Sequence, residues 1–168
     1  MIDLNVINRW NEAEVRTAFL RCCGSSRWAD LMTARRPFRD EADLLAAAVD
    51  IWRGLDQADW LEAFATHPRI GDVESLRKKF AATAAWSAHE QAGVTGAAEE
   101  VLQALAEGNR AYEARFGYLF LICATGQTAE EMLTRLRQRL GHAPEEELHY
   151  AAAEQEKITQ LRLHKLTP

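Results

Sequence analysis

Apolar side chains recur every three or four positions along most of the chain, which is the spacing that gives an α-helix one apolar face. The alternation typical of β-strands is almost absent. Polar cap residues and glycine or proline breaks divide this pattern into separate segments. These segments predict helices over residues 12–23, 25–33, 40–54, 56–67, 74–80, 84–92, 97–116, 128–140 and 144–166.

The ends of the predicted helices follow from capping residues and helix breakers. Asn11 with Glu14, and Thr128 with Glu131, have the spacing of a capping box. The Arg36-Pro37 pair interrupts the helical pattern because proline restricts the backbone of the residue before it. Glycine is expected to end helices at positions 24, 54, 93 and 141.

These eight or nine helices predict an irregular all-α globule without a sheet. The helices are short and their breaks are frequent, which does not suit a regular up-down bundle. No internal repeat, low-complexity tract or long linker divides the chain. We therefore expect residues 1–168 to form a single all-α domain.

Composition and charge argue against several classes of protein. The 168 residues are 48% apolar and 27% charged, with a net charge of −5, and the basic residues are scattered rather than concentrated on one face. No apolar run approaches the ~20 residues of a membrane span, and the N-terminus lacks the layout of a secretory signal. We expect a cytoplasmic protein that binds neither nucleic acid nor membrane. Its three cysteines, Cys22, Cys23 and Cys123, are expected to be reduced, buried and unreactive.

The segment 66–72, Thr-His-Pro-Arg-Ile-Gly-Asp, concentrates chemical groups between two helical patterns. Loops presented by a rigid scaffold often carry function. Histidine has the side-chain pKa nearest neutrality, so His67 is the first candidate for proton transfer.

Three other clusters have both a functional and a structural interpretation. Ser87, Glu90 and Gln91 share one face of a predicted helix and together suit a polar ligand, although periodicity alone favours a solvated face. Residues 115–124 form either a kinked, buried helix or a break whose free N–H groups bind a ligand carbonyl. Arg162 has the chemistry to clamp an anion, and the competing interpretation is an ion pair with Glu154 or a neighbouring acid.

Metal and phosphate sites find no support in the spacing of the chain. His67 and His89 are not at the spacing of a zinc-binding helix, and no grouping of Cys and His matches a zinc site. No glycine-rich phosphate loop follows a strand, and no nucleophile elbow is present. Acid–base chemistry without a cofactor is therefore the expected activity.

Four motifs in one order resemble a known family over essentially the whole chain. They are HPRIGD at 67–72, SxxEQ at 87–91, FGYxF at 116–120 and KIxxLRLxxL at 157–166. The sequence resembles the 2-oxo-4-hydroxy-4-carboxy-5-ureidoimidazoline (OHCU) decarboxylases of urate breakdown. This resemblance implies an all-α carboxy-lyase, often a homodimer, with no metal or organic cofactor. It also implies a small anionic ureidoimidazoline as substrate and (S)-allantoin as product.

The resemblance also implies roles for individual residues. His67 is expected to be the catalytic acid/base, and Glu90 is expected to orient the imidazole or the substrate hydroxyl. Arg162 is expected near the substrate's charge. The other expected substrate contacts are Pro68, Ser87, Gln91, Phe116 and the segment Ile122, Cys123, Ala124, Thr125 and Gly126, whose backbone would hold a carbonyl oxygen.

Other functions stay open at this point. A helical module that binds a ureido or purine-like ligand without chemistry would bind equally well without the proton of His67. A hydrolase of a related ureido intermediate would use Glu90 to activate water and would release ammonia rather than CO₂. A protein-interaction domain would need an exposed apolar patch.

Overall fold

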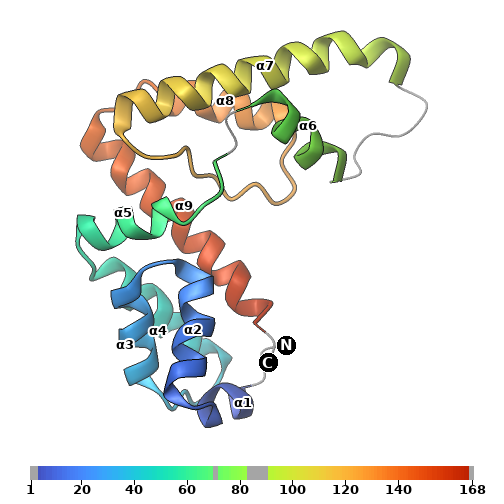
Figure 1. The fold of residues 1–168 in the computed structure, drawn as a ribbon. Helices are drawn as coiled ribbons and strands as arrows, with labels where there is room; N and C mark the ends of the chain where they lie inside the picture. Colours follow the sequence, from blue (N-terminus) through green and yellow to red (C-terminus); the bar gives the residue numbers. More distant parts are fainter. Residues whose placement is uncertain (1–3, 70–71, 83–90, 167–168) are drawn as a thin grey trace. The chain divides into compact units, whose positions relative to one another are not determined.

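The computed structural model describes residues 4–69, 72–82 and 91–166, with backbone alone for 81–82 and 91–97. This part of the chain contains nine helices and no strand, so the all-α prediction is confirmed (Figure 1). The helices are α1 Leu4–Arg9, α2 Glu12–Cys23, α3 Ser26–Arg35, α4 Glu41–Arg53, α5 Gln57–Ala65, α6 Val73–Ala82, α7 Gln91–Phe116, α8 Ala129–Arg139 and α9 Pro144–His164. Within this described part, no helix combines the length and apolar character of a membrane span.

The chain divides into two compact units, residues 1–67 with 150–168 and residues 68–149. Helix α9 contributes residues to both, and each unit has buried apolar residues of its own. The single-domain expectation for residues 1–168 stays a prediction.

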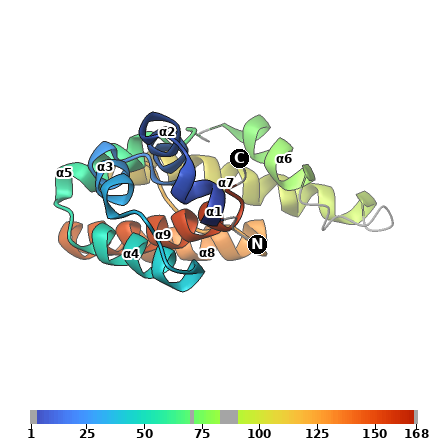
Figure 2. The ribbon, with the colours of Figure 1, turned by 90° about the horizontal axis from the view of Figure 1, so that it is seen from below.

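In the first unit, α3 packs against α2, α4 and α5 (Figure 2). Phe19 of α2 is fully buried and meets the ring of Trp28 edge-on, with ring centroids 5.9 Å apart. The buried indole of Trp28 donates a hydrogen bond to the Ala48 carbonyl at 3.0 Å. Trp52 of α4 donates in the same way to the Ala152 carbonyl of α9 at 2.9 Å. Each large aromatic ring thus packs in the core while its N–H fixes the position of a neighbouring helix.

The predicted helix starts of the first unit are confirmed. The side chains of Asn11, Ser25, Asp40 and Asp56 each accept a hydrogen bond from a first-turn N–H, which satisfies a donor that the helix itself leaves unpaired. Helix α1 was not predicted from the sequence because six residues are too few for a clear period. Arg36 fixes the end of this helix by donating to the Ile7 and Trp10 carbonyls at 3.0 and 2.9 Å.

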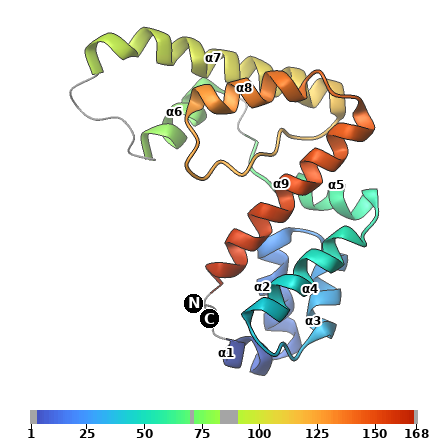
Figure 3. The same ribbon diagram turned by 180° about the vertical axis from the view of Figure 1, so that it is seen from behind.

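In the second unit, α7 packs against α6 and α8 (Figure 3). Helices α7 and α8 run in the same direction. Gly108 of α7 lies against Leu136 of α8. One turn further along both helices, Arg139 of α8 donates a hydrogen bond to the Tyr112 hydroxyl of α7. Parallel neighbours need a connection that returns along their length. Residues 117–128 provide it in non-helical conformation, and 12 extended residues reach about 40 Å, more than the ~16 Å length of α8.

One of the two interpretations of residues 115–124 and one predicted helix end in the second unit are wrong. Residues 118–124 do not form a kinked helix, because the return connection needs an extended chain there. Gly93 does not end a helix, since α7 runs through it and through Gly96 as part of 26 continuous residues. A glycine inside a helix costs about 1 kcal/mol, which a helix of this length offsets. Most of the predicted helix 84–92 lies outside the described residues.

Gly24 ends α2 in the left-handed region, at φ 88°, and lies very close to Thr66. A Cβ at residue 24 would overlap the side chain of Thr66, with Oγ1 as its nearest atom. The glycine therefore allows the end of α5 to approach the end of α2.

We expect Gly24→Ala to lower the free energy of unfolding by about 2–4 kcal/mol, from backbone strain together with steric overlap. The double variant Gly24→Ala/Thr66→Ala removes the overlap with the Thr66 hydroxyl and should recover part of this loss. Guanidinium unfolding curves of both variants and of Thr66→Ala measure the difference. Equal losses in the single and double variants would contradict the close approach as its cause.

Candidate active site

His67 follows the C-terminal end of α5, where the chain leaves the first unit's helices. Thr66 caps α5, and the N–H groups of Thr66 and His67 bond back to the carbonyls of Ala63 and Phe64 at 3.2 and 3.3 Å. The His67 side chain is half-buried. The backbone position of the imidazole is therefore set by the last turn of a helix rather than by a free loop.

Gln155 of α9 holds the imidazole from the other side. Its side chain is fully buried, and its Oε1 lies 2.6 Å from His67 Nε2. Its Nε2 donates to the Cys23 carbonyl at 3.2 Å and to Thr159 Oγ1 at 3.1 Å. One buried amide thus joins His67 to the end of α2 and to the next turn of α9.

Arg162 lies on the same helix and binds the neighbouring carbonyl at the end of α2. Its Nη1 donates to the Cys22 carbonyl at 3.2 Å. Within the described residues Arg162 makes no ion pair, and Glu154 pairs instead with Lys157 at 2.6 Å. The alternative interpretation of Arg162 as an ion-pair partner of Glu154 is therefore wrong.

Burial lowers the pKa of His67 below its ordinary value of 6.5. The Gln155 hydrogen bond opposes this shift, and the positive charge of Arg162 adds to it. The imidazole is therefore neutral at pH 7 and available as a base. Because protonation is disfavoured in the folded state, stability falls as the pH drops through 6.5 toward the folded pKa.

The two adjacent cysteines are structural rather than reactive. Cys22 and Cys23 are buried and free, as predicted. Burial raises the pKa of Cys22 to about 11 and that of Cys23 to about 12, so neither is a thiolate at neutral pH. Cys123 is only half-buried, so the prediction of a buried thiol is wrong for this residue.

The second unit holds the other described candidates. Phe116 ends α7 and packs on Tyr112, with ring centroids 4.7 Å apart. In the return connection, exposure increases from buried Ile122 through half-buried Cys123 and Ala124 to exposed Thr125 and Gly126. Gly126 has φ 77°, which turns the chain sharply before α8. The chain around residues 123–126 thus presents backbone groups outside regular structure, as the proposed carbonyl-binding role requires.

A buried carboxylate holds this connection in place. Glu147 is fully buried and accepts hydrogen bonds from the Tyr112 hydroxyl and from Arg139, whose Nη2 lies 2.6 Å from Oε1. Glu147 Oε2 lies 2.8 Å from His142 Nδ1. Arg139 also donates to the Leu121 carbonyl at 2.6 Å, just before the candidate segment. The charge of Glu147 therefore fixes, through Arg139, the backbone that leads into residues 122–126.

The remaining candidates are described only in part. Pro68 is exposed and precedes Arg69, which forms an ion pair with Glu113. Ser87 and Glu90 lie outside the described residues, and Gln91 is described by its backbone as the first residue of α7. The grouping of this trio with His67 stays a prediction.

Sequence reasoning missed Gln155 and Thr159. Both occupy the buried face of α9, together with Ala151, Ala152 and Leu163. Polar residues at apolar-face positions were the available signal, because a buried amide must find partners. Their partners lie far away in the sequence, so spacing alone gave no reason to connect them with His67.

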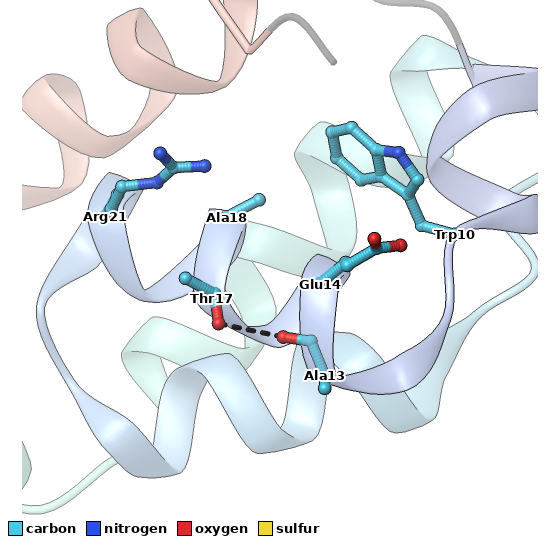
Figure 4. A pocket seen from close by; sticks show the side chains of 6 residues that line it. All are labelled: Trp10, Ala13, Glu14, Thr17, Ala18 and Arg21. Atoms are coloured by element: carbon cyan, nitrogen blue, oxygen red, sulfur yellow. Dashed lines mark hydrogen bonds between the residues drawn. The ribbon is translucent and has the colours of Figure 1, made fainter.

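One pocket of about 440 Å³ lies elsewhere in the first unit (Figure 4). Its lining comes from the end of α1 and one face of α2: Trp10, Ala13, Glu14, Thr17, Ala18 and Arg21. None of the candidate residues lines it. Among the described residues, no group of three or more His, Cys, Asp or Glu side chains is arranged to hold a metal ion.

Comparison with known proteins identifies the family. The family model of OHCU decarboxylase matches residues 8–164, which include every candidate residue and most of each unit. The chain belongs to the OHCU decarboxylase family.

Relatives and a solved structure agree with this family. The chain is 41% identical over 148 residues to the uric acid degradation bifunctional protein TTL of Arabidopsis thaliana, and this match covers 86% of the chain and 45% of that protein. It is 35% identical over 131 residues to the OHCU decarboxylase of Amia calva, covering 78% of the chain and 74% of that protein. The chain thus spans less than half of the plant relative and most of the fish relative.

A crystal structure of OHCU decarboxylase in the presence of (S)-allantoin resembles this fold, with a TM-score of 0.71 and 40% sequence identity. The match covers 88% of this chain and 95% of that one.

We expect Glu147→Gln to lower the free energy of unfolding of this OHCU decarboxylase family member by about 3–5 kcal/mol. The substitution leaves the buried Arg139 cation without its carboxylate. Glu99→Gln, which breaks an exposed pair with Arg77, is the control and should cost about 0–1 kcal/mol. Urea unfolding measures both variants. Similar losses would contradict the role of Glu147 as the buried anchor of the return connection.

We also expect Arg162→Gln to raise the pKa of His67, because a nearby positive charge is removed. Arg21→Gln removes an equal charge from α2. The Arg21 charge is not among those that shift the pKa of His67, so this variant should leave that pKa unchanged. Titration of the His67 ring signals by NMR compares the two. A pKa of His67 that is unchanged in Arg162→Gln would contradict their proximity.

Proposed function

We propose that this chain catalyses the decarboxylation of OHCU to (S)-allantoin and CO₂, with His67 as the acid/base group. The observation that carries the proposal is the His67 centre: a half-buried imidazole, held by a buried amide, with its pKa lowered and an arginine beside it. Family membership supplies the reaction, a carbon–carbon bond cleavage in urate degradation.

The substrate's structure explains why proton transfer is the help that it needs. Breaking the bond between carbon 4 and the carboxylate releases CO₂ and leaves an electron pair that forms a double bond to carbon 5. The electrons of the imidazoline double bond move onto its ring nitrogen, which takes up a proton from solvent. The 4-hydroxyl then loses a proton as it becomes a carbonyl, and carbon 5 gains one. The chain must therefore take up and deliver one proton at neighbouring positions.

His67 suits this task because its imidazole is neutral at pH 7 and able to accept the hydroxyl proton. Returning the proton to one face of a planar intermediate would produce a single enantiomer. Arg162 would bind the substrate's negative charge, since its guanidinium is held by one carbonyl and has further donors available.

The other candidates complete the proposed site. Glu90 would orient the imidazole or the substrate hydroxyl, and Ser87, Gln91, Pro68 and Phe116 would line the site. Backbone groups of residues 122–126 would hold a carbonyl oxygen and stabilise charge that develops on it. No cofactor takes part in the proposed reaction. A homodimer and a cytoplasmic location are further parts of the proposal.

We expect His67→Gln to lower turnover by about 10²–10⁴-fold, the usual contribution of a positioned acid/base group, and to remove the excess of (S)-allantoin. His164→Gln replaces an exposed histidine that pairs with Glu41, and it should retain both rate and handedness. Circular dichroism with freshly generated substrate follows the enantiomer, and a CO₂ assay follows turnover.

Full stereospecific turnover by His67→Gln would contradict the proposed role of His67. Release of ammonia without CO₂ would favour a hydrolase instead. Binding of (S)-allantoin without any turnover by the unaltered chain would favour a binding module.

A further inference from the structure

We propose that Gln155 is a positioning residue that keeps His67 in its Nε2–H form, so that Nδ1 is the ring atom that exchanges a proton with the substrate. The proposal rests on the proposed function and adds to it the atom that reacts and the residue that selects this atom.

The Gln155 amide is confined on all sides by protein. Its side chain is fully buried, so its polar atoms must find partners within the protein. Three contacts fill its surroundings: His67 Nε2 at 2.6 Å on one side, and the Cys23 carbonyl and Thr159 hydroxyl at 3.2 and 3.1 Å on the other.

The Cys23 carbonyl determines the orientation of this amide. The carbonyl oxygen of Cys23 has lone pairs and no proton, so it only accepts hydrogen bonds. The amide NH₂ must therefore face Cys23. A flipped amide would place two oxygen acceptors against each other and would leave the buried NH₂ facing the imidazole. The Cys23 carbonyl thus fixes Oε1 toward His67.

The orientation of the amide determines which nitrogen of the His67 ring carries a hydrogen. Oε1 of an amide also only accepts, so the ring nitrogen opposite it must carry the hydrogen. His67 Nε2 therefore donates to Gln155 whether the imidazole is neutral or cationic. In the neutral ring the lone pair then lies on Nδ1.

The other ring nitrogen of His67, Nδ1, is available to a substrate. Among the described residues, Nδ1 of His67 has no hydrogen-bond partner. The side chain is half-buried rather than enclosed. Nδ1 is therefore the ring nitrogen that can meet a substrate proton, while Nε2 stays bonded to Gln155 through the whole cycle.

The end of α2 supports both groups of this arrangement. The Cys22 and Cys23 carbonyls lie in the last turn of the helix, where carbonyls have no partner within the helix. They accept from Arg162 and Gln155 respectively. The two side chains that surround His67 are thus anchored on adjacent peptide groups.

The test compares the ring nitrogens of His67 in the unaltered enzyme, in Gln155→Met and in Thr159→Val. Methionine has similar length and flexibility but no acceptor for the ring N–H. Valine at 159 removes a different contact of the same amide and leaves the contact of Oε1 with His67 intact. Two-dimensional ¹H–¹⁵N NMR of the resting protein, above the pKa of His67, shows which ring nitrogen carries the proton.

We expect a proton on Nε2 in the unaltered enzyme and in Thr159→Val, with slow exchange against solvent. In Gln155→Met the Nε2 proton should exchange quickly and the Nδ1–H form should appear. Its kcat should fall by about tenfold or more with a smaller change in KM, because the ring is misoriented while the substrate contacts remain.

A proton on Nδ1 in the unaltered enzyme would overturn the proposal, and this result does not depend on any variant folding. Equal kcat and equal Nε2 protection in Gln155→Met would overturn it as well. The NMR measurement needs no turnover, so the two proposals fail separately. An active enzyme with Nδ1–H contradicts the role of Gln155 alone, and an Nε2–H ring in a chain that makes no (S)-allantoin contradicts the proposed function alone.

Discussion

The C-terminal end of α2 is the constraint on which the surroundings of His67 depend. Two carbonyls without partners in the helix accept hydrogen bonds from Gln155 and Arg162, and Gly24 brings the next residue pair, Thr66 and His67, close to them. A helix end normally satisfies such carbonyls with solvent or a cap. Here they fix the two side chains of α9 that set the orientation and the charge around one imidazole.

In the second unit, a buried ion pair rather than a buried amide holds the backbone in place. Glu147 is buried beside Arg139, and the remaining donors of Arg139 hold the Leu121 carbonyl. A buried ion pair contributes little net stability when compared with apolar packing. It does fix direction, and in this chain it fixes the return connection that two parallel helices require. Each unit therefore places its candidate site residues through a buried polar group that is held by more than one partner.

Local signals in the sequence predicted much of this arrangement. Asn11, Ser25 and Thr128 begin helices as expected, because capping is a contact between residues two or three positions apart. Residues 115–124 kept two interpretations because their apolar character fits a buried extended segment as well as a helix. His67 became a candidate because of its own chemistry. Gln155 was missed because its importance comes from contacts with Cys23 and His67, 132 and 88 positions away.

The central claim is that the imidazole of His67 meets the reacting carbon without help from another catalytic base. A crystal structure of the protein with (S)-allantoin bound tests it most directly. We expect the ligand with its ring within hydrogen-bond reach of His67 Nδ1, about 3 Å, and with a carbonyl or ureido oxygen facing Arg162. Allantoin bound in the pocket on α2, or bound with His67 turned away from it, would contradict the account.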